Sequence, residues 1–261
     1  MHLHQPRLKI DRAVAKIDEA KHAFGATGII PRFVARTDAG TGESFIRLRL
    51  FDVDDIVHVI VGEAVYQLRS ALDVAAVALA RANGAAEVSH VAFPIAKSQT
   101  AFASRNIQKD KMGGLSQPVK DVIASFAPYP GGNELLHGLS DLCNTDKHNN
   151  LIGSIAEIGN VTAFHPSANF MEDMSIGVFA GRFASAMIDN GHLASDGLEF
   201  KLKPDDDDAE KIATMMTRRM RLRVGLLFSG TDNLDGCEVF QTLSDMVGLV
   251  GSIIQKLEEA S

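Results

Sequence analysis

The longest apolar stretch of the chain spans residues 55–83 and predicts a buried helix. Its main polar residues lie on one side: on a helix with about 100° per residue, they fall within an arc roughly 80° wide. They are His58, Tyr66, Arg69 and Asp73, and Gly62 lies in the same arc. The pattern therefore predicts a helix with one polar seam. Because a buried charge is costly without a partner, Arg69 and Asp73 are expected to find partners in the fold.

A second stretch, residues 134–158, contains the sequence NTDKHNN and predicts a second core helix. Its apolar side carries Leu135, Leu139, Leu142 and Cys143. Its opposite side carries His137, Asp141, Asn144 and His148, within an arc of about 60°. Asp146 falls toward the apolar side, which makes it the expected buried partner of Arg69 if the two helices pack antiparallel.

Weaker helical patterns occupy four other segments. They are residues 10–24, 117–126, 209–217 and 238–259. The last of these carries a heptad seam, which can dock on its own domain or pair two copies in a homodimer. For the helix at 55–83, Asp54 or Asp55 is the expected N-terminal cap, and Asn83 with Gly84 is the expected stop.

Strand patterns come before and after the helical core. Residues 32–37 and 44–51 flank a turn with two glycines and predict a β-hairpin. Its Arg36, Arg47 and Arg49 lie beside Phe33 and Phe45, as on a stacking face for single-stranded nucleic acid, although an ordinary solvated face is the preferred interpretation. From Val161 onward, short alternating runs between turns predict an antiparallel sheet.

These elements predict an α+β fold. We expect a helical core of two long packed helices, with an N-terminal β-hairpin and a C-terminal antiparallel sheet packed on it. The expected organisation is a single domain over residues 1–261. One subdivision remains open, with the helical core and hairpin at 1–160 and the sheet and C-terminal helix at 161–261.

Composition restricts the functional classes. The net charge is −7 and the pI is about 5.7, which argues against a broad electrostatic surface for nucleic acid but allows a local basic patch. Cys143 and Cys237 lie far apart, which fits a reducing compartment. No apolar run has the length of a signal peptide or of an uncharged membrane span. We expect a cytoplasmic protein that does not enter a membrane.

One candidate site binds a divalent metal on the second helix. His137 and Asp141 can supply two ligands for zinc or iron. His148 is eleven residues from His137, about 16 Å along the axis, so the two cannot share an ion. His58 or Glu63 would have to complete the set. A solvated polar helix face is the simpler interpretation of the same residues.

The other candidate site performs acid–base chemistry with Arg69, Asp73, Asp146 and His148. A histidine oriented by a carboxylate acts as a general base, and an arginine stabilises a phosphate or an oxyanion. The simpler alternative is a buried network that fixes the register of two helices. The sequence lacks GxxxxGK, a GxGxxG after a strand, GxSxG, HExxH and paired CxxC motifs.

Three segments resemble a widespread group of bacterial proteins with the pattern G-x5-LRSALD-H, FP-I and L-x2-L-x-N-x-DKHR. The matching residues are Gly62, Leu68 to Asp73, Phe93, Pro94, Ile95, Leu139, Leu142, Asn144, Asp146, Lys147 and His148. In that pattern the arginine and the histidine five residues later are similar to the R-x4-H pair of HEPN-type helical ribonucleases. The resemblance implies a helical protein that binds RNA or a protein partner, with a role as a toxin or in phage defence.

The sequence departs from the HEPN-type pattern at two positions. Val74 stands where the histidine is expected, and Asn149 stands in place of the arginine after DKH. Valine neither takes nor gives a proton, so cleavage of RNA by that pair is not expected. Two alternatives to the HEPN-like protein stay open: a metal-dependent or acid–base hydrolase centred on the DKH helix, and a non-catalytic ligand-binding or structural module. The sequence does not decide whether the chain is an enzyme.

Overall fold

A computed structural model describes residues 3–26, 32–49, 53–145, 156–159, 199–201, 209–219, 223–228 and 233–261. The chain divides into two compact units. Unit 1 comprises Met1–Ala26, Asp54–Leu151 and Phe228–Ser261, and unit 2 comprises Thr27–Val53 and Ile152–Leu227. Helices and antiparallel strands are both present, so the predicted α+β class is confirmed.

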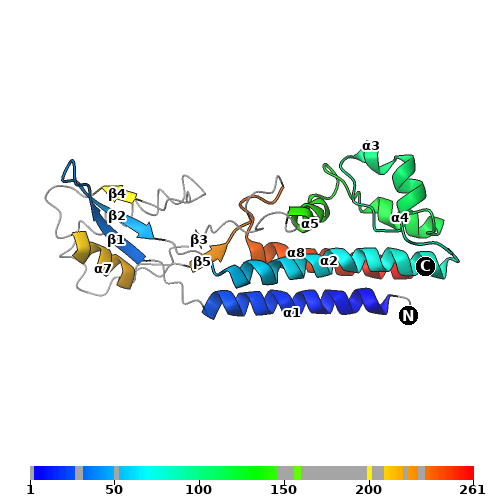
Figure 1. The fold of residues 1–261 in the computed structure, drawn as a ribbon, viewed down its shortest axis with the longest axis horizontal. Helices are drawn as coiled ribbons and strands as arrows, with labels where there is room; N and C mark the ends of the chain where they lie inside the picture. Colours follow the sequence, from blue (N-terminus) through cyan, green and yellow to red (C-terminus); the bar gives the residue numbers. More distant parts are fainter. Residues whose placement is uncertain are drawn as a thin grey trace. The chain divides into compact units, whose positions relative to one another are not determined.

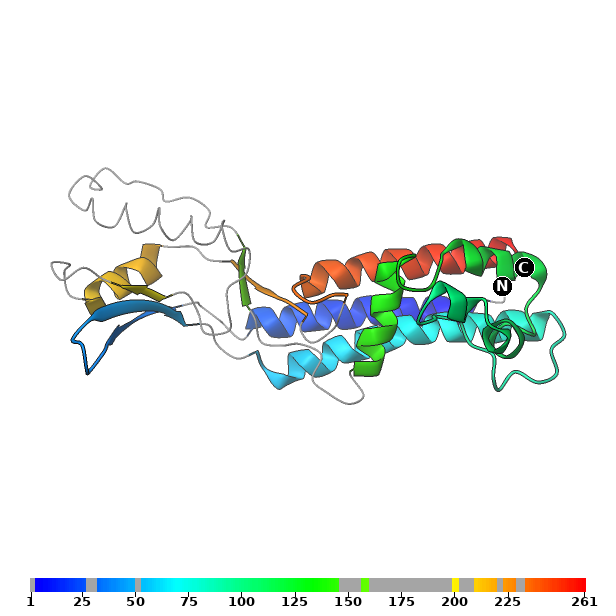
Figure 2. The same cartoon turned by 90° about the horizontal axis from the view of Figure 1, so that it is seen from above.

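Unit 1 is built on three helices that run side by side: α1 (His4–Ala26), α2 (Asp55–Ala82) and α8 (Val239–Glu259) (Figures 1 and 2). The prediction for α2 is confirmed at both ends. The side chain of Asp54 accepts a hydrogen bond from the Ile56 amide at 3.1 Å, and Gly84 follows the helix with a φ of 86°. No described helix is long and apolar enough to cross a membrane.

The heptad seam of α8 is covered within unit 1. Its members are fully buried against the other helices: Val239, Leu243, Met246, Val250, Ile253 and Leu257. The helix packs on α1 and α2. Of the two uses predicted for this seam, docking on its own unit is the one that the structure shows, and the seam is not free to pair two copies.

The second core helix differs from the prediction. The structure describes α5 as Glu134–Thr145, and residues 156–159 form the strand β3 (Ala156–Gly159), so no helix reaches Ile158. Helix α5 crosses α2 and does not pack antiparallel along it (Figures 1 and 2). The predicted pair of long packed helices is therefore wrong. The long helices that run beside the 28-residue α2 are α1 and α8, with 23 and 21 residues, whereas α5 has only 12.

Shorter elements complete unit 1 between α2 and α5. They are α3 (Gln99–Phe102), the π-helical turn η1 (Asn106–Lys111) and α4 (Gln117–Ser125). The prediction for α4 at residues 117–126 is confirmed, with Phe126 as its C-terminal cap. Residues 91–96 lie between α2 and α3 without helix or strand, as expected around Pro94.

Unit 2 contains the predicted hairpin, formed by β1 (Arg32–Thr37) and β2 (Ser44–Arg49). Phe33 pairs with Leu48 and Ala35 with Ile46, and Phe33 and Ile46 are buried. Phe33 therefore belongs to the apolar face, which removes it from the predicted basic, stacking face. Helix α7 (Ala209–Arg219) packs on this hairpin, where its Thr217 Oγ1 accepts a hydrogen bond from the Phe33 amide at 2.9 Å.

The described strands of the C-terminal half join two different sheets. Strand β4 (Glu199–Lys201) extends the hairpin by pairing with β2, and β3 pairs with β5 (Arg223–Leu226). The remaining runs of the predicted C-terminal sheet lie outside the described residues, so that sheet stays a prediction. The units also differ from the subdivision at residues 160 and 161. The hairpin belongs to unit 2, where β2 pairs with β4, and not to the helical core. Helix α8 belongs to unit 1, where its apolar face is buried, and not to the unit that contains β4 and β5.

Truncation of Leu243 to alanine tests the packing of α8. Because this side chain is fully buried, its loss removes apolar contacts and leaves a cavity, so the free energy of unfolding is expected to fall by about 2–5 kcal/mol. Ser252→Ala, on the exposed side of the same helix, is the control and should change it by less than about 0.5 kcal/mol. Equal effects of the two substitutions in chemical denaturation would contradict this packing.

Candidate functional site

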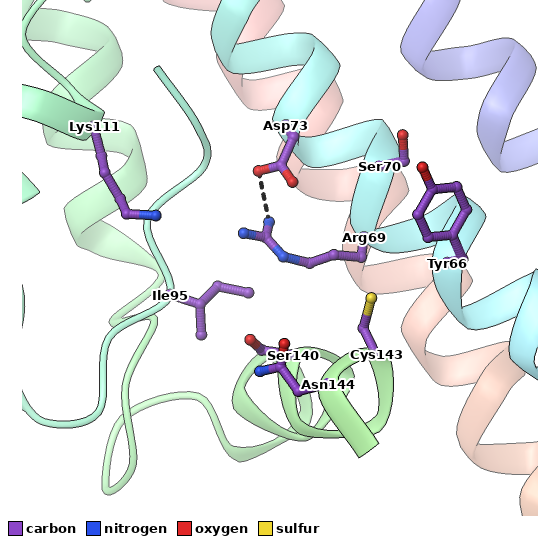
Figure 3. Close-up of a pocket in the computed structure, with 9 residues that line it drawn as sticks. All are labelled: Tyr66, Arg69, Ser70, Asp73, Ile95, Lys111, Ser140, Cys143 and Asn144. Atoms are coloured by element: carbon purple, nitrogen blue, oxygen red, sulfur yellow. Dashed lines mark ion pairs between the residues drawn. The ribbon is translucent and has the colours of Figure 1, made fainter. Parts of the chain in front are cut away.

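A polar pocket of about 360 Å³ lies in unit 1 (Figure 3). Its walls come from α2, from the extended segment after it, from the end of η1 and from α5. The lining residues are Tyr66, Arg69, Ser70, Asp73, Ile95, Lys111, Ser140, Cys143 and Asn144. The pocket therefore gathers residues from the LRSALD, FP-I and N-x-DKH segments, which lie far apart in the sequence.

The central feature of the site is the contact of Arg69 and Asp73 with Phe93. Arg69 Nη2 donates a hydrogen bond to the Phe93 carbonyl oxygen at 3.0 Å. Asp73 Oδ1 accepts one from the Phe93 amide, also at 3.0 Å. Both polar backbone groups of one residue are thus held by two side chains one helical turn apart. We call this arrangement the Phe93 clamp.

Local sequence explains why Phe93 is available for the clamp. The residue before a proline is restricted to extended conformations, so Phe93, ahead of Pro94, cannot continue a helix that would use its backbone groups. Arg69 and Asp73 are four residues apart on α2 and therefore lie on the same face. The two charged residues of the polar seam were expected to find partners in the fold, and the backbone of Phe93 is one of these partners.

Within the clamp, Arg69 Nη1 lies 2.9 Å from Asp73 Oδ1. The two atoms form an ion pair without the alignment of a hydrogen bond. This buried nitrogen has no hydrogen-bond acceptor among the described residues. Neighbouring atoms cover this nitrogen, and its closest described polar contact is the Asp73 carboxylate.

Burial affects the two charged groups of the clamp differently. The Arg69 side chain is 15% exposed, and that of Asp73 is 37% exposed. Burial raises the pKa of the Asp73 carboxyl, and this outweighs Arg69, the Phe93 amide and Lys111, which all favour the charged form. Water screens part of each effect at such exposure. The pocket therefore holds a carboxylate that takes up a proton more readily than a free aspartate.

Lys111 brings a second positive charge to the pocket. It is the last residue of η1, and its side chain approaches from the side opposite α2 (Figure 3). Its carbonyl oxygen accepts a hydrogen bond from the Ala92 amide at 3.3 Å. Since Ala92 precedes Phe93, the clamp also helps to position the end of η1 over the pocket.

Helix α5 supplies Ser140 and Asn144, one turn apart on the side that faces the pocket (Figure 3). Asn144 was predicted from the sequence pattern, whereas Ser140 and Lys111 were not. The four-residue spacing of Ser140 and Asn144 was a usable signal. Lys111 lies in a polar, loop-like run, and no pattern in that run places it beside α2.

The structure brings together only part of the predicted acid–base site. Arg69 and Asp73 are in contact, whereas Asp146 and His148 lie outside the described residues. The described partners of Arg69 are Asp73 and the Phe93 carbonyl, so the predicted Arg69–Asp146 pair stays a prediction. The alternative was a buried network that fixes the register of two helices. The described network instead attaches the extended segment at Phe93 to α2.

The predicted metal ligands form a separate pair outside the pocket. His137 Nδ1 lies 3.1 Å from Asp141 Oδ2 and 2.7 Å from Asn233 Nδ2. Of the two further ligands considered on α2, Glu63 forms an ion pair with Lys16 at 2.5 Å, and His58 Nδ1 is buried without a hydrogen-bond partner among the described residues. In the described parts of the chain, no three His, Cys, Asp or Glu side chains are grouped to hold a metal ion. Metal binding by His137 and Asp141 therefore stays a prediction with two of its ligands in place.

Comparison of the sequence with models of protein families gave no match, and curated proteins and solved structures gave no significant match either. The resemblance to HEPN-type proteins stays a prediction.

Arg69→Ala tests the Phe93 clamp. It removes the bond to the Phe93 carbonyl and leaves Asp73 without its nearest cation, so the free energy of unfolding should fall by about 1–3 kcal/mol. Arg12→Ala, an exposed position on α1, provides a matched control and should lower it by less than about 0.5 kcal/mol. Denaturant titration of both variants measures the difference. If Arg69→Ala is no more destabilising than Arg12→Ala, the clamp does not stabilise unit 1.

Asp73→Asn tests the raised pKa of Asp73. A carboxyl with a raised pKa in the folded state stabilises the fold most below its unfolded pKa, near 3.8. That contribution is lost as the pH rises through the folded-state pKa. The stability of wild type relative to Asp73→Asn should therefore fall between pH 4 and pH 7, measured by the melting temperatures of both proteins. A relative stability that rises over this interval would show a lowered pKa.

Proposed function

We propose that this chain is a HEPN-like helical protein that binds single-stranded RNA at the pocket between α2, η1 and α5 and does not cleave it. The observation that carries the proposal is the presence of Arg69 and Lys111 in one pocket with a single carboxylate, Asp73. Arginine and lysine are the side chains that most often contact phosphate groups. The resemblance supports the choice of RNA, because its three segments contribute residues to this pocket.

Tyr66 adds a second feature that suits single-stranded RNA. It lines the pocket and is 54% exposed, so its ring is accessible to a ligand. Proteins that bind single strands combine basic side chains with aromatic rings on which bases stack. A ring at the edge of a cationic pocket offers both contacts to one nucleotide.

The charge of the chain restricts the size of the ligand. A net charge of −7 repels a long polyanion, so binding must depend on the local charge of the pocket. A short unpaired segment or the end of a strand satisfies this condition better than a duplex. A toxin or phage-defence role is part of the proposal through the resemblance alone.

The absence of cleavage follows from the residues at the predicted catalytic pair. Val74 has no proton to exchange, and the Arg69 guanidinium is engaged with Phe93 and Asp73. One observation favours the alternative of an acid–base hydrolase, namely the raised pKa of Asp73 in the same pocket. Hydrolysis would shorten the RNA, so the length of the RNA after incubation with the protein distinguishes a hydrolase from a protein that only binds.

Lys111→Ala tests RNA binding at the pocket. Loss of this ammonium should weaken the binding of a fluorescent single-stranded RNA about tenfold, as measured by anisotropy. Lys109→Ala removes the same charge two residues away on η1, from an exposed side chain that lines a different cavity, and should leave the affinity within about twofold of wild type. The RNA should be recovered intact.

Equal weakening by the two substitutions would mean that RNA contacts the surface without using the pocket. The absence of binding by wild type at low salt would refute the proposal, because electrostatic contacts are strongest there. Cleaved RNA that depends on Asp73 would favour the hydrolase.

A further inference from the structure

We propose that the pocket recognises a phosphomonoester, the terminal phosphate of a nucleotide or of an RNA strand, in preference to the phosphodiester backbone. This inference deepens the proposed function and, for the RNA strand, rests on it. It is carried by the convergence of Arg69 and Lys111 on one pocket, together with uncharged donors from α5.

The pocket has a net positive charge and attracts a dianion more strongly than a monoanion. Arg69 enters from α2 and Lys111 from η1, on opposite sides of the space (Figure 3). Asp73 offsets one of these positive charges. A phosphomonoester carries about −1.5 to −2 at pH 7, whereas each backbone phosphodiester carries −1. Because the pocket keeps a net positive charge, it attracts the more highly charged monoester more strongly, although Asp73 also repels the monoester more strongly.

The hydrogen-bond donors fit the same group. A terminal phosphate has three strong acceptor oxygens. Arg69 contributes its positive charge at the wall of the pocket, and the Lys111 ammonium has three donor positions. Ser140 and Asn144 add a hydroxyl and an amide from α5. Several donors from separate elements can thus reach the oxygens of one phosphate.

The volume fits a nucleotide and does not suit a continuing strand. About 360 Å³ lies near the lower end of the range for small-molecule sites and exceeds the space that a phosphate alone needs. The Phe93 clamp fixes one wall, and α5 closes another (Figure 3). A strand that runs through a site needs basic side chains along a groove, whereas these two cations meet at one place. The geometry therefore favours a chain end or a free nucleotide.

The test uses the full-length chain and four probes: adenosine, adenosine 5′-monophosphate, and one RNA oligonucleotide with and without its 5′-phosphate. Adenosine monophosphate should raise the melting temperature of wild type, and adenosine should not. The phosphorylated oligonucleotide should bind about tenfold more tightly than its 5′-hydroxyl form. Lys111→Ala should abolish both preferences, and Lys109→Ala should retain them. An unchanged melting temperature of the unliganded Lys111→Ala protein shows that its fold is intact.

The outcomes separate the two proposals. Equal binding of both oligonucleotides, weakened by Lys111→Ala, would leave RNA binding in place and overturn the preference for a monoester. Stabilisation by adenosine monophosphate that depends on Lys111, without binding of either oligonucleotide, would support the phosphomonoester site and refute RNA as its source. No response to any probe would overturn both.

Discussion

The Phe93 clamp is the contact on which the site depends. Arg69 and Asp73 take the backbone carbonyl and the amide of one residue, so two charged side chains of α2 are satisfied by a single peptide segment. A buried backbone group without a partner costs about as much as a lost hydrogen bond, and a buried charge costs more. The clamp lowers both costs, which helps to explain how the largely apolar helix α2 carries an arginine and an aspartate.

The clamp also prepares the pocket. It holds the Arg69 guanidinium in one orientation and fixes the segment that leads to Ile95 at the pocket wall. Through the Ala92–Lys111 hydrogen bond it connects to the end of η1, which carries the second cation. Binding sites work best when their charged groups are held before the ligand arrives. The same contacts that stabilise unit 1 therefore hold Arg69 and Lys111 on opposite sides of the pocket. Asp73 is the acidic residue that both of them face.

The sequence predicts the helices and strands better than it predicts the tertiary contacts of their side chains. Helix α2 follows from a long apolar stretch with capping signals, α8 follows from its heptad seam, and the hairpin follows from two alternating runs around a glycine turn. The partner of Arg69 could not be predicted in this way, because it includes a backbone carbonyl and any residue type supplies one. Periodicity also overstated the 134–158 helix, since it does not report that Ala156–Gly159 pairs with β5. Lys111 enters the site through tertiary packing of a π-helical turn, which leaves no local pattern.

Hydrogen exchange of the Phe93 amide, followed by NMR in wild type and in Asp73→Ala, tests the clamp most directly. The account predicts slow exchange in wild type, because the amide is buried and bonded to Asp73 Oδ1. It predicts exchange about tenfold faster, or more, in the variant, with the amides of the α2 core unchanged. Fast exchange of this amide in wild type, or equal protection in both proteins, would show that Asp73 does not hold Phe93.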